Sequence, residues 1–256
     1  MAKTAGPAPG FTKHPDKMIR FEPTERRVRM GIGDTVIADS LHAHLLLESG
    51  HLPVYYLPRE DVRLDSLSLG TRSSYCPFKG EATYYTVRAG DRRAVDAVWS
   101  YETPYDEMAA IAGWLAFDWR TIERCWEEDE EVIGHPRDPY HRIDLRFSRR
   151  RVRVVLGGET VADSRRALFL FETGIRTRYY LPAEDVRLDL LTPTTTTSIC
   201  PYKGRASYWS ASVGGRRFDD VVWSYLDPLP DQPRIKGLLA FYDEKMDAVL
   251  IDPPDV

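Results

Sequence analysis

Apolar and polar residues alternate along most of the chain, the pattern typical of half-buried β-strands. In the second half, RRVRVVLGGETVADS predicts two strands joined by a turn at Gly157-Gly158. ALFLFETG and RYYLP predict two further strands, separated at Gly174. ASYWSASVGGRRFDDVVWSY predicts another hairpin around Gly214-Gly215, and GLLAFYDEKMDAVLID predicts one that turns at Asp243-Glu244.

The first half shows the same plan, with turns at Gly33-Asp34 and Gly90-Asp91. Helical signal is thin: Asp106 to Ala112 predicts about two turns. Pro58 suits the first position of another short helix. Frequent short strands with glycine turns predict a mainly β fold with little helix.

The chain repeats itself. YYLPREDVRLD from Tyr55 matches YYLPAEDVRLD from Tyr179, and CPFKG from Cys76 matches CPYKG from Cys200. The offset is constant, 200 minus 76 or 124 residues. A repeat of this length indicates a duplicated domain and not a solenoid, whose units run to roughly 20–50 residues.

A run of charged residues followed by glycine and proline is typical of an exposed connection between two domains. Such a run extends from Trp126 to Glu131, and Gly134 and Pro136 follow it. We therefore place one domain at 11–130 and its copy at 131–256. Two copies in one chain also predict an intramolecular contact between them.

Composition narrows the class of protein. Of 256 residues, 43% are hydrophobic and 29% charged, within the range of globular proteins. A net charge of −4 argues against an obligate nucleic-acid binder. The sequence has no apolar run long enough to span a membrane and no secretory signal, and its three cysteines cannot form a disulfide framework. We expect a cytoplasmic protein.

Several polar clusters are identical in the two copies while many apolar positions differ. The first is Cys-Pro-aromatic-Lys-Gly, in which a lysine stands three residues after a cysteine and could lower its pKa at a bend. The candidate catalytic residues are therefore Cys76 and Lys79, with Cys200 and Lys203 in the copy. Buried packing of the cysteine is the alternative.

The second cluster is EDVRLD, in which acidic and basic residues would share one face of an extended segment while Val62 and Leu64 are buried. An arginine held between carboxylates can donate two parallel hydrogen bonds to a planar or anionic ligand. The alternative is an ion-pair network that fastens a loop to the sheet. The polar ligand-binding candidates, which include a matched glutamate at a strand end, are Glu48, Asp61 and Arg63, and Glu172, Asp185 and Arg187.

Matched aromatic residues complete the candidate site, because those that do not face the core can line a pocket. They are Tyr56, Tyr84, Trp99 and Tyr101, and Tyr180, Tyr208, Trp223 and Tyr225. There is no CxxC pair, and no histidine of the second copy matches His42, His44 or His51, so we expect no metal and no cofactor.

The strings RVRVxxGGETVADS, YYLPxEDVRLDLL, CPYKGxASYWS and GLLAFY resemble the domain of unknown function 427. The resemblance covers nearly the whole chain and implies a small, mainly β domain similar to the β-tent fold. Relatives with that fold carry zinc on CxxC pairs, which this sequence lacks. Some members carry a nucleotidyltransferase label, but the sequence has no Gly-Ser with paired Asp motif to support it.

Three functions remain open. The first is binding of a small polar or aromatic metabolite in a cleft of each repeat, with or without catalysis. The second is a non-enzymatic interaction module formed by an internal pseudo-dimer. The third is RNA or DNA binding through the arginines from Arg146 to Arg153, which would also suit a charged edge strand. Because Phe78 stands in the first copy where the second has Tyr202, we expect the second site to be the stronger one.

Overall fold

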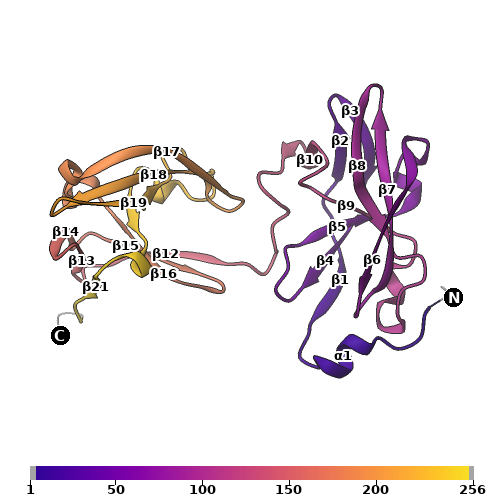
Figure 1. The fold of residues 1–256 in the computed structure, drawn as a ribbon, viewed down its shortest axis with the longest axis horizontal. Coiled ribbons are helices and arrows are strands. Elements are labelled where there is room, and N and C mark those ends of the chain that lie inside the picture. The colour runs from indigo at the N-terminus through magenta and orange to yellow at the C-terminus, as the bar shows by residue number, and fades with distance from the viewer. Residues whose placement is uncertain (1–3, 254–256) are drawn as a thin grey trace. The chain divides into compact units, whose positions relative to one another are not determined.

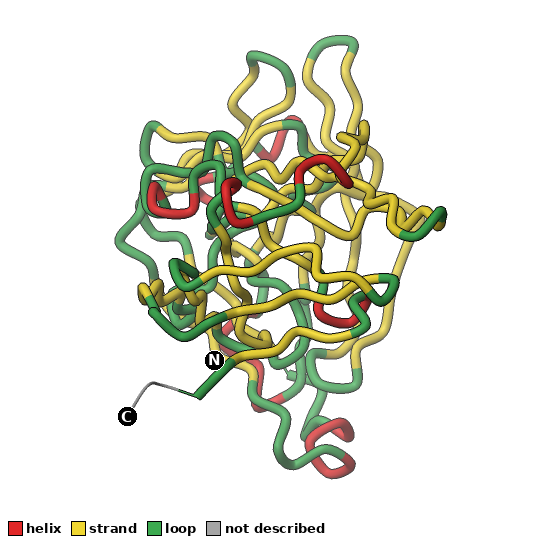
Figure 2. Tube along the Cα trace, turned by 90° about the vertical axis from the view of Figure 1, so that its left-hand side faces the viewer, coloured by secondary structure: helices red, strands yellow, loops and turns green. Residues whose placement is uncertain are grey.

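The computed structural model describes residues 4–253. The chain divides into two compact units between Asp138 and Pro139, and each unit holds one repeat (Figure 1). Strands dominate both units, as predicted (Figure 2). None of the helices in the described part of the chain has the length and apolar character that a membrane crossing requires.

The first unit has a seven-stranded antiparallel sheet in the order β1-β4-β5-β9-β8-β7-β6. Its strands are β1 (Ile19–Pro23), β4 (His44–Glu48), β5 (Val54–Leu57), β6 (Leu67–Cys76), β7 (Gly80–Ala89), β8 (Arg92–Ser100) and β9 (Leu115–Phe117). A four-stranded sheet, in the order β11-β10-β2-β3, packs against it. Its strands are β2 (Val28–Ile32), β3 (Thr35–Ser40), β10 (Arg124–Glu127) and β11 (Glu130–Glu131).

The second unit repeats this architecture, with a seven-stranded sheet in the order β12-β15-β16-β20-β19-β18-β17. Its strands are β12 (Ile143–Phe147), β15 (Leu168–Glu172), β16 (Ile175–Leu181), β17 (Leu191–Cys200), β18 (Gly204–Val213), β19 (Arg216–Ser224) and β20 (Leu239–Phe241). The small sheet has three strands, β13 (Val152–Leu156), β14 (Glu159–Ser164) and β21 (Ala248–Ile251).

Helices are short. The α-helix is α1 (Pro9–Lys13). The 3₁₀-helices are η1 (Arg59–Asp61), η2 (Leu64–Ser66), η3 (Asp106–Ile111), η4 (Ala183–Asp185), η5 (Leu188–Leu190), η6 (Pro233–Ile235) and η7 (Asp243–Lys245). The helix predicted from Asp106 is thus present as 3₁₀ turns with a kink at Met108.

Strand alternation gives each large sheet two apolar faces. In the first unit, Leu45 and Tyr55 face the core that the large sheet shares with the small one. Their neighbours Leu46 and Tyr56 face the other way and belong to a second cluster, together with Tyr101. This second face lies outside the sandwich, and η3 packs on part of it.

The structure confirms the hairpins at Gly157-Gly158 and Gly214-Gly215. The hairpin predicted at Asp243-Glu244 is wrong. η7 turns the chain away from the large sheet, so β20 pairs with β16 and β19 while β21 pairs with β13 in the small sheet. β20 and β21, although they follow each other in the chain, therefore belong to different sheets.

Two local predictions also differ. The acidic residues at 130–131, expected in an exposed connection, form strand β11 and pair with β10. EDVRLD is not extended, because η1 and η2 interrupt it. Val62 is buried as predicted, but Leu64 is 46% exposed since it lies in η2.

Candidate functional site

The second face of the large sheet in the first repeat carries a cavity of about 500 Å³. Six residues that the sequence singled out line it: Glu48, Tyr56, Lys79, Tyr84, Trp99 and Tyr101. They come from β4, β5, β7, β8 and the turns beside them. The remaining lining includes Leu46, Val54, Arg72, Asp96, Asp118 and Trp119.

A buried ion pair lies in this lining. Lys79 Nζ donates to Glu48 Oε2, and the two side chains are 9% and 7% exposed. The turn of CPFKG sets Lys79 in place: its backbone N–H donates to the Cys76 carbonyl, and Gly80 follows with a φ of 101°, which favours glycine.

A second cation supports the same carboxylate, since Lys17 Nζ lies 2.9 Å from Glu48 Oε1. Burial alone would raise the pKa of the Glu48 carboxyl. The ammonium groups of Lys79 and Lys17 outweigh that effect and hold its pKa below the usual value. Glu48 is therefore an anion at neutral pH, anchored from two sides.

The second repeat has the equivalent pair. Lys203 Nζ lies 2.5 Å from Glu172 Oε2, and both side chains are less than one-tenth exposed. His141, 124 residues after Lys17, donates from Nε2 to Glu172 Oε1 at 2.9 Å and stacks on Tyr202 with centroids 4.1 Å apart. The polar identity noticed in the sequence thus reflects a buried pair present in both copies.

Aromatic rings form the cavity wall of the first repeat. The centroids of Tyr84 and Trp99 are 6.4 Å apart, and Tyr56 meets Trp99 edge-on at 6.3 Å. The guanidinium of Arg72 lies 4.3 Å from the centroid of Tyr84, a cation–π contact. Burial raises the pKa of the Tyr56 and Tyr101 phenols, so both are neutral hydroxyl groups.

The same aromatic residues are packed more tightly in the second repeat. Tyr180, Tyr208, Trp223 and Tyr225 are all buried. Trp223 Nε1 donates to Tyr180 Oη at 3.2 Å. An additional ring, that of Tyr242, packs on Trp223 with centroids 4.5 Å apart.

The EDVRLD residues do not reach the cavity of the first repeat. Asp61 and Arg63 line a separate surface depression beside β3. Asp61 accepts a hydrogen bond from Ser40 Oγ at 2.7 Å. We expected Arg63 and Lys79 to line one cavity, and this prediction is wrong. η1 and η2 keep the Arg63 segment against the small sheet, away from the cavity that Lys79 lines.

In the second repeat the corresponding residues, Asp185 and Arg187, form hydrogen bonds and ion pairs with nearby side chains. Asp185 accepts from Ser164 Oγ at 2.6 Å and forms an ion pair with Arg166. Arg187 forms a two-pronged ion pair with Asp189 on the surface. These contacts fit the network that fastens a loop to the sheet.

The matched cysteines are free thiols and half-buried, and Cys125 is buried. Cys76 packs against the second apolar cluster of the first repeat, and Cys200 against its counterpart. Lys79 and Lys203 are engaged by glutamates, so they are not positioned as ion partners of these thiols.

Asp96 is a cavity residue that sequence reasoning missed. Its φ of 52° lies in the left-handed region, and Asp220 in the second repeat has a φ of 47°. Both stand where the hairpin register shifts by a bulge. An aspartate inside an apolar strand was the available signal, because aspartate is disfavoured in strands and tolerates this conformation.

Among residues 4–253, no group of three or more His, Cys, Asp or Glu side chains is arranged to hold a metal ion. The polar groups in the cavity include hydroxyl groups and charged side chains, among them the paired Glu48 and Lys79. The cavity's aromatic walls and few convergent polar groups are typical of small-molecule sites.

A comparison with curated proteins finds no match. A family model, described as Domain of unknown function (DUF427), matches the chain twice, over residues 20–128 and 144–252. Apart from β11 and the first residues of β1 and β12, the two matches include the strands of both repeats, and together they span most of the sequence. The chain therefore belongs to the DUF427 family and contains two tandem copies of its domain.

Proposed function

We propose that the first repeat binds a small organic molecule in the cavity beside Glu48 and Lys79. The observation that carries the proposal is the convergence of six sequence-matched residues on one cavity of about 500 Å³. Sites for drug-sized ligands have volumes of roughly 300–1,000 Å³ and mixed apolar and polar walls. Because Lys79 is engaged by Glu48, the proposal concerns binding and assigns no catalytic step.

The geometry favours the first repeat over the second, the reverse of the ranking expected from Tyr202. Larger side chains, Arg178 and Tyr242, occupy the corresponding face of the second repeat. The Arg178 guanidinium lies 5.5 Å from the Trp223 ring and forms ion pairs with Asp243 and Glu244. The alternative of a non-enzymatic interaction module stays a prediction.

A thermal-shift screen against nucleotides, sugars, aldehydes and metabolite acids tests the proposal, since a ligand of the folded state raises the melting temperature. Each hit is repeated on Val54→Arg, which places a long side chain in the cavity, and on Val36→Arg. Val36 is exposed on β3 and lies outside the cavity, so it is the matched control.

We expect hits whose thermal shift is lost in Val54→Arg and retained in Val36→Arg. Hits that raise the melting temperature equally in both variants would place the ligand elsewhere and overturn the proposal. So would a screen in which no compound distinguishes the two variants.

A further inference from the structure

Asp118 and Tyr242 occupy the same position in the two repeats. Each follows the Leu-Ala-Phe strand of its large sheet, β9 or β20. The Asp118 N–H donates to the Ala97 carbonyl at 2.8 Å, and the Tyr242 N–H donates to the Val221 carbonyl at 3.1 Å. Since 242 minus 118 and 221 minus 97 are both 124, sequence and hydrogen bonding agree on the equivalence.

The Tyr242 ring lies among aromatic residues of the second repeat. It is stacked parallel to Tyr208, with an interplanar angle of 11° and centroids 6.4 Å apart, and it contacts Trp223. Its hydroxyl lies 3.3 Å from the Tyr208 hydroxyl. A phenol ring from the chain itself therefore fills this face.

The first repeat has the same aromatic neighbours without that ring. Trp99 and Tyr84 are the counterparts of Trp223 and Tyr208, and both line the cavity together with Asp118. The Asp118 carboxylate is short and is used locally, since it accepts from the backbone N–H of Arg120 at 3.0 Å and from Thr121 Oγ1 at 3.2 Å. The space beside Trp99 therefore belongs to the cavity.

A second difference enlarges the cavity. Val54 pairs with Leu46 across the sheet, and Arg178 pairs with Leu170 in the same register. The arginine of the second repeat covers both Trp223 and Tyr242, whereas Val54 leaves the face open and lines the cavity.

The remaining contacts favour a neutral ring with a hydroxyl group. Tyr84 Oη bonds to Ser74 Oγ at 2.8 Å, as Tyr208 Oη bonds to Ser198 Oγ. A phenolic hydroxyl both donates and accepts, so a further hydrogen bond is available, as Tyr208 shows. Acidic and basic lining residues balance one another, with Glu48, Asp96 and Asp118 against Arg72, Lys79 and Arg120.

We infer that the cavity of the first repeat takes a hydroxylated aromatic ring, bound beside Trp99 with its hydroxyl at Tyr84, where the second repeat inserts Tyr242. This inference rests on the proposed function and adds the chemical class of the ligand. The chain thus contains one open copy of the site and one copy closed by its own side chain.

NMR of the tryptophan indole N–H signals tests the inference in the full chain, with 4-methylphenol as the probe. We expect saturable shifts of the Trp99 signal and none of the Trp223 signal. Asp118→Tyr supplies the missing ring from the chain and should weaken probe binding at least tenfold. Val36→Tyr, which adds a ring on β3 outside the cavity, is the matched control and should bind as the wild type does.

The reciprocal variant provides an independent arm. Arg178→Val with Tyr242→Asp removes the two side chains that close the second repeat, and it should add probe-dependent shifts at Trp223. Toluene and 4-methylcyclohexanol, which lack the hydroxyl or the aromatic ring, should bind at least tenfold more weakly than 4-methylphenol.

Absence of 4-methylphenol binding to the wild type would overturn the inference, as would unchanged binding in a folded Asp118→Tyr variant. The proposed function fails separately. A non-aromatic hit from the thermal-shift screen that is lost in Val54→Arg would uphold the site while contradicting the aromatic ligand. If no compound of any class depends on Val54, both fail together.

Discussion

Lys203 Nζ lies 2.5 Å from the Glu172 carboxylate, in a pair that the chain also forms between Lys79 and Glu48. Removing one partner of a buried pair leaves an uncompensated charge, which costs about 3–5 kcal/mol. We therefore predict that Lys203→Met lowers the free energy of unfolding of the second repeat by about this amount. Urea unfolding followed by tryptophan fluorescence measures it.

The control is the double variant Glu172→Leu with Lys203→Met, which replaces the pair by apolar side chains. It should recover most of the lost stability, because neither charge is then left buried alone. A loss below about 1 kcal/mol in Lys203→Met, the range of exposed pairs, would show that the pair is solvated.

The alternation of apolar residues predicted the strands well because it reflects the burial of one face of each strand. It could not show which strands join across a sheet: β20 and β21 are neighbours in sequence but belong to different sheets. Matching the repeats identified Glu48 and Lys79 as candidates, yet it also selected Arg63. A residue can be identical in both copies because it fastens a loop or because it lines the cavity, and the sequence does not distinguish these two reasons.

The cavity itself depends on differences between the copies, which a search for identical residues passes over. Val54 and Asp118 are unremarkable in the sequence, and their importance appears only beside Arg178 and Tyr242. The strained conformation of Asp96 is likewise set by the bulge between β7 and β8, a feature of strand register.

The acid stability of the first repeat should depend on Glu48. Its pKa is lowered in the folded protein, so it contributes stability above its unfolded pKa of about 4.3. That contribution disappears as the pH falls through the lower folded pKa. We predict that Glu48→Gln is less stable than the wild type at pH 7 and that the difference shrinks below about pH 4.

Thermal melts between pH 7 and pH 3 measure this difference. Glu81→Gln is the control, because Glu81 is an exposed carboxylate on β7 outside the cavity. A Glu48→Gln variant whose deficit stays constant over the whole range would contradict the assigned role.

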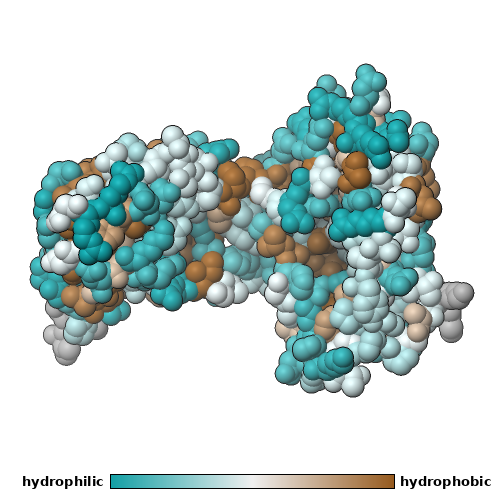
Figure 3. Space-filling model, viewed as in Figure 1, coloured by the Kyte–Doolittle hydropathy of each residue, from teal (hydrophilic) through white to brown (hydrophobic). Residues whose placement is uncertain are grey.

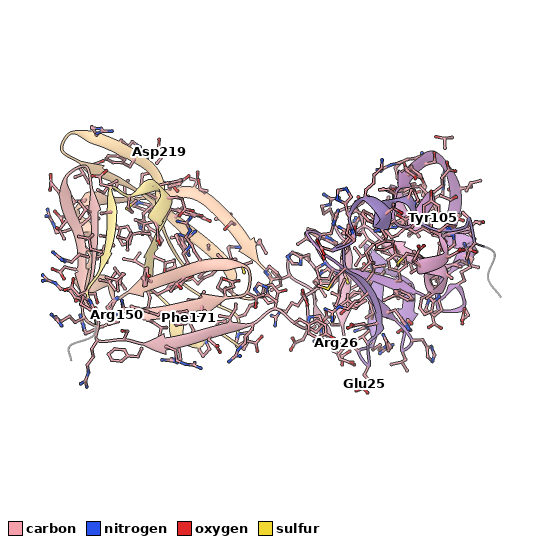
Figure 4. All side chains as sticks on the ribbon, turned by 90° about the horizontal axis from the view of Figure 1, so that it is seen from below. Glu25, Arg26, Tyr105, Arg150, Phe171 and Asp219 are labelled. Atoms are coloured by element: carbon pink, nitrogen blue, oxygen red, sulfur yellow. The ribbon has the colours of Figure 1, made fainter. Side chains whose placement is uncertain are left out.

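The arginines from Arg146 to Arg153 should not support nucleic-acid binding. Arg151 and Arg153 form ion pairs with Asp163 and Asp252. Arg150, labelled in Figure 4, donates to the Asp252 carbonyl and lies 5.8 Å from the centroid of Phe169. Because these three of the five arginines in this stretch are engaged, we predict no retention on heparin at low salt, since binding to phosphates depends on several available cations.

Hydrophilic and apolar residues are interspersed on the visible face of each repeat (Figure 3). Retention that falls steeply with salt and is reduced in Arg149→Ser with Arg146→Ser would contradict the prediction. Both of these arginines are exposed, so the double variant leaves the core intact.

Replacing the strained aspartates should affect the two repeats unequally. Asp96 and Asp220 share a positive φ, which costs an alanine about 1–2 kcal/mol. Asp220 also accepts hydrogen bonds from the Thr194 and Thr196 hydroxyls, each at 2.7 Å. Gly70 and Arg72 stand at the corresponding positions of the first repeat, so Asp96 lacks these two hydroxyl donors.

Asp220→Ala should therefore cost more stability than Asp96→Ala, by on the order of 1 kcal/mol, because it loses the hydroxyl contacts as well as the tolerance for positive φ. Asp96→Gly removes the backbone penalty and should be at least as stable as Asp96→Ala. Urea unfolding of the three variants provides the comparison. Equal costs for the two alanine variants would mean that the threonine hydroxyls contribute nothing, and that the bulge alone explains the aspartate at both positions.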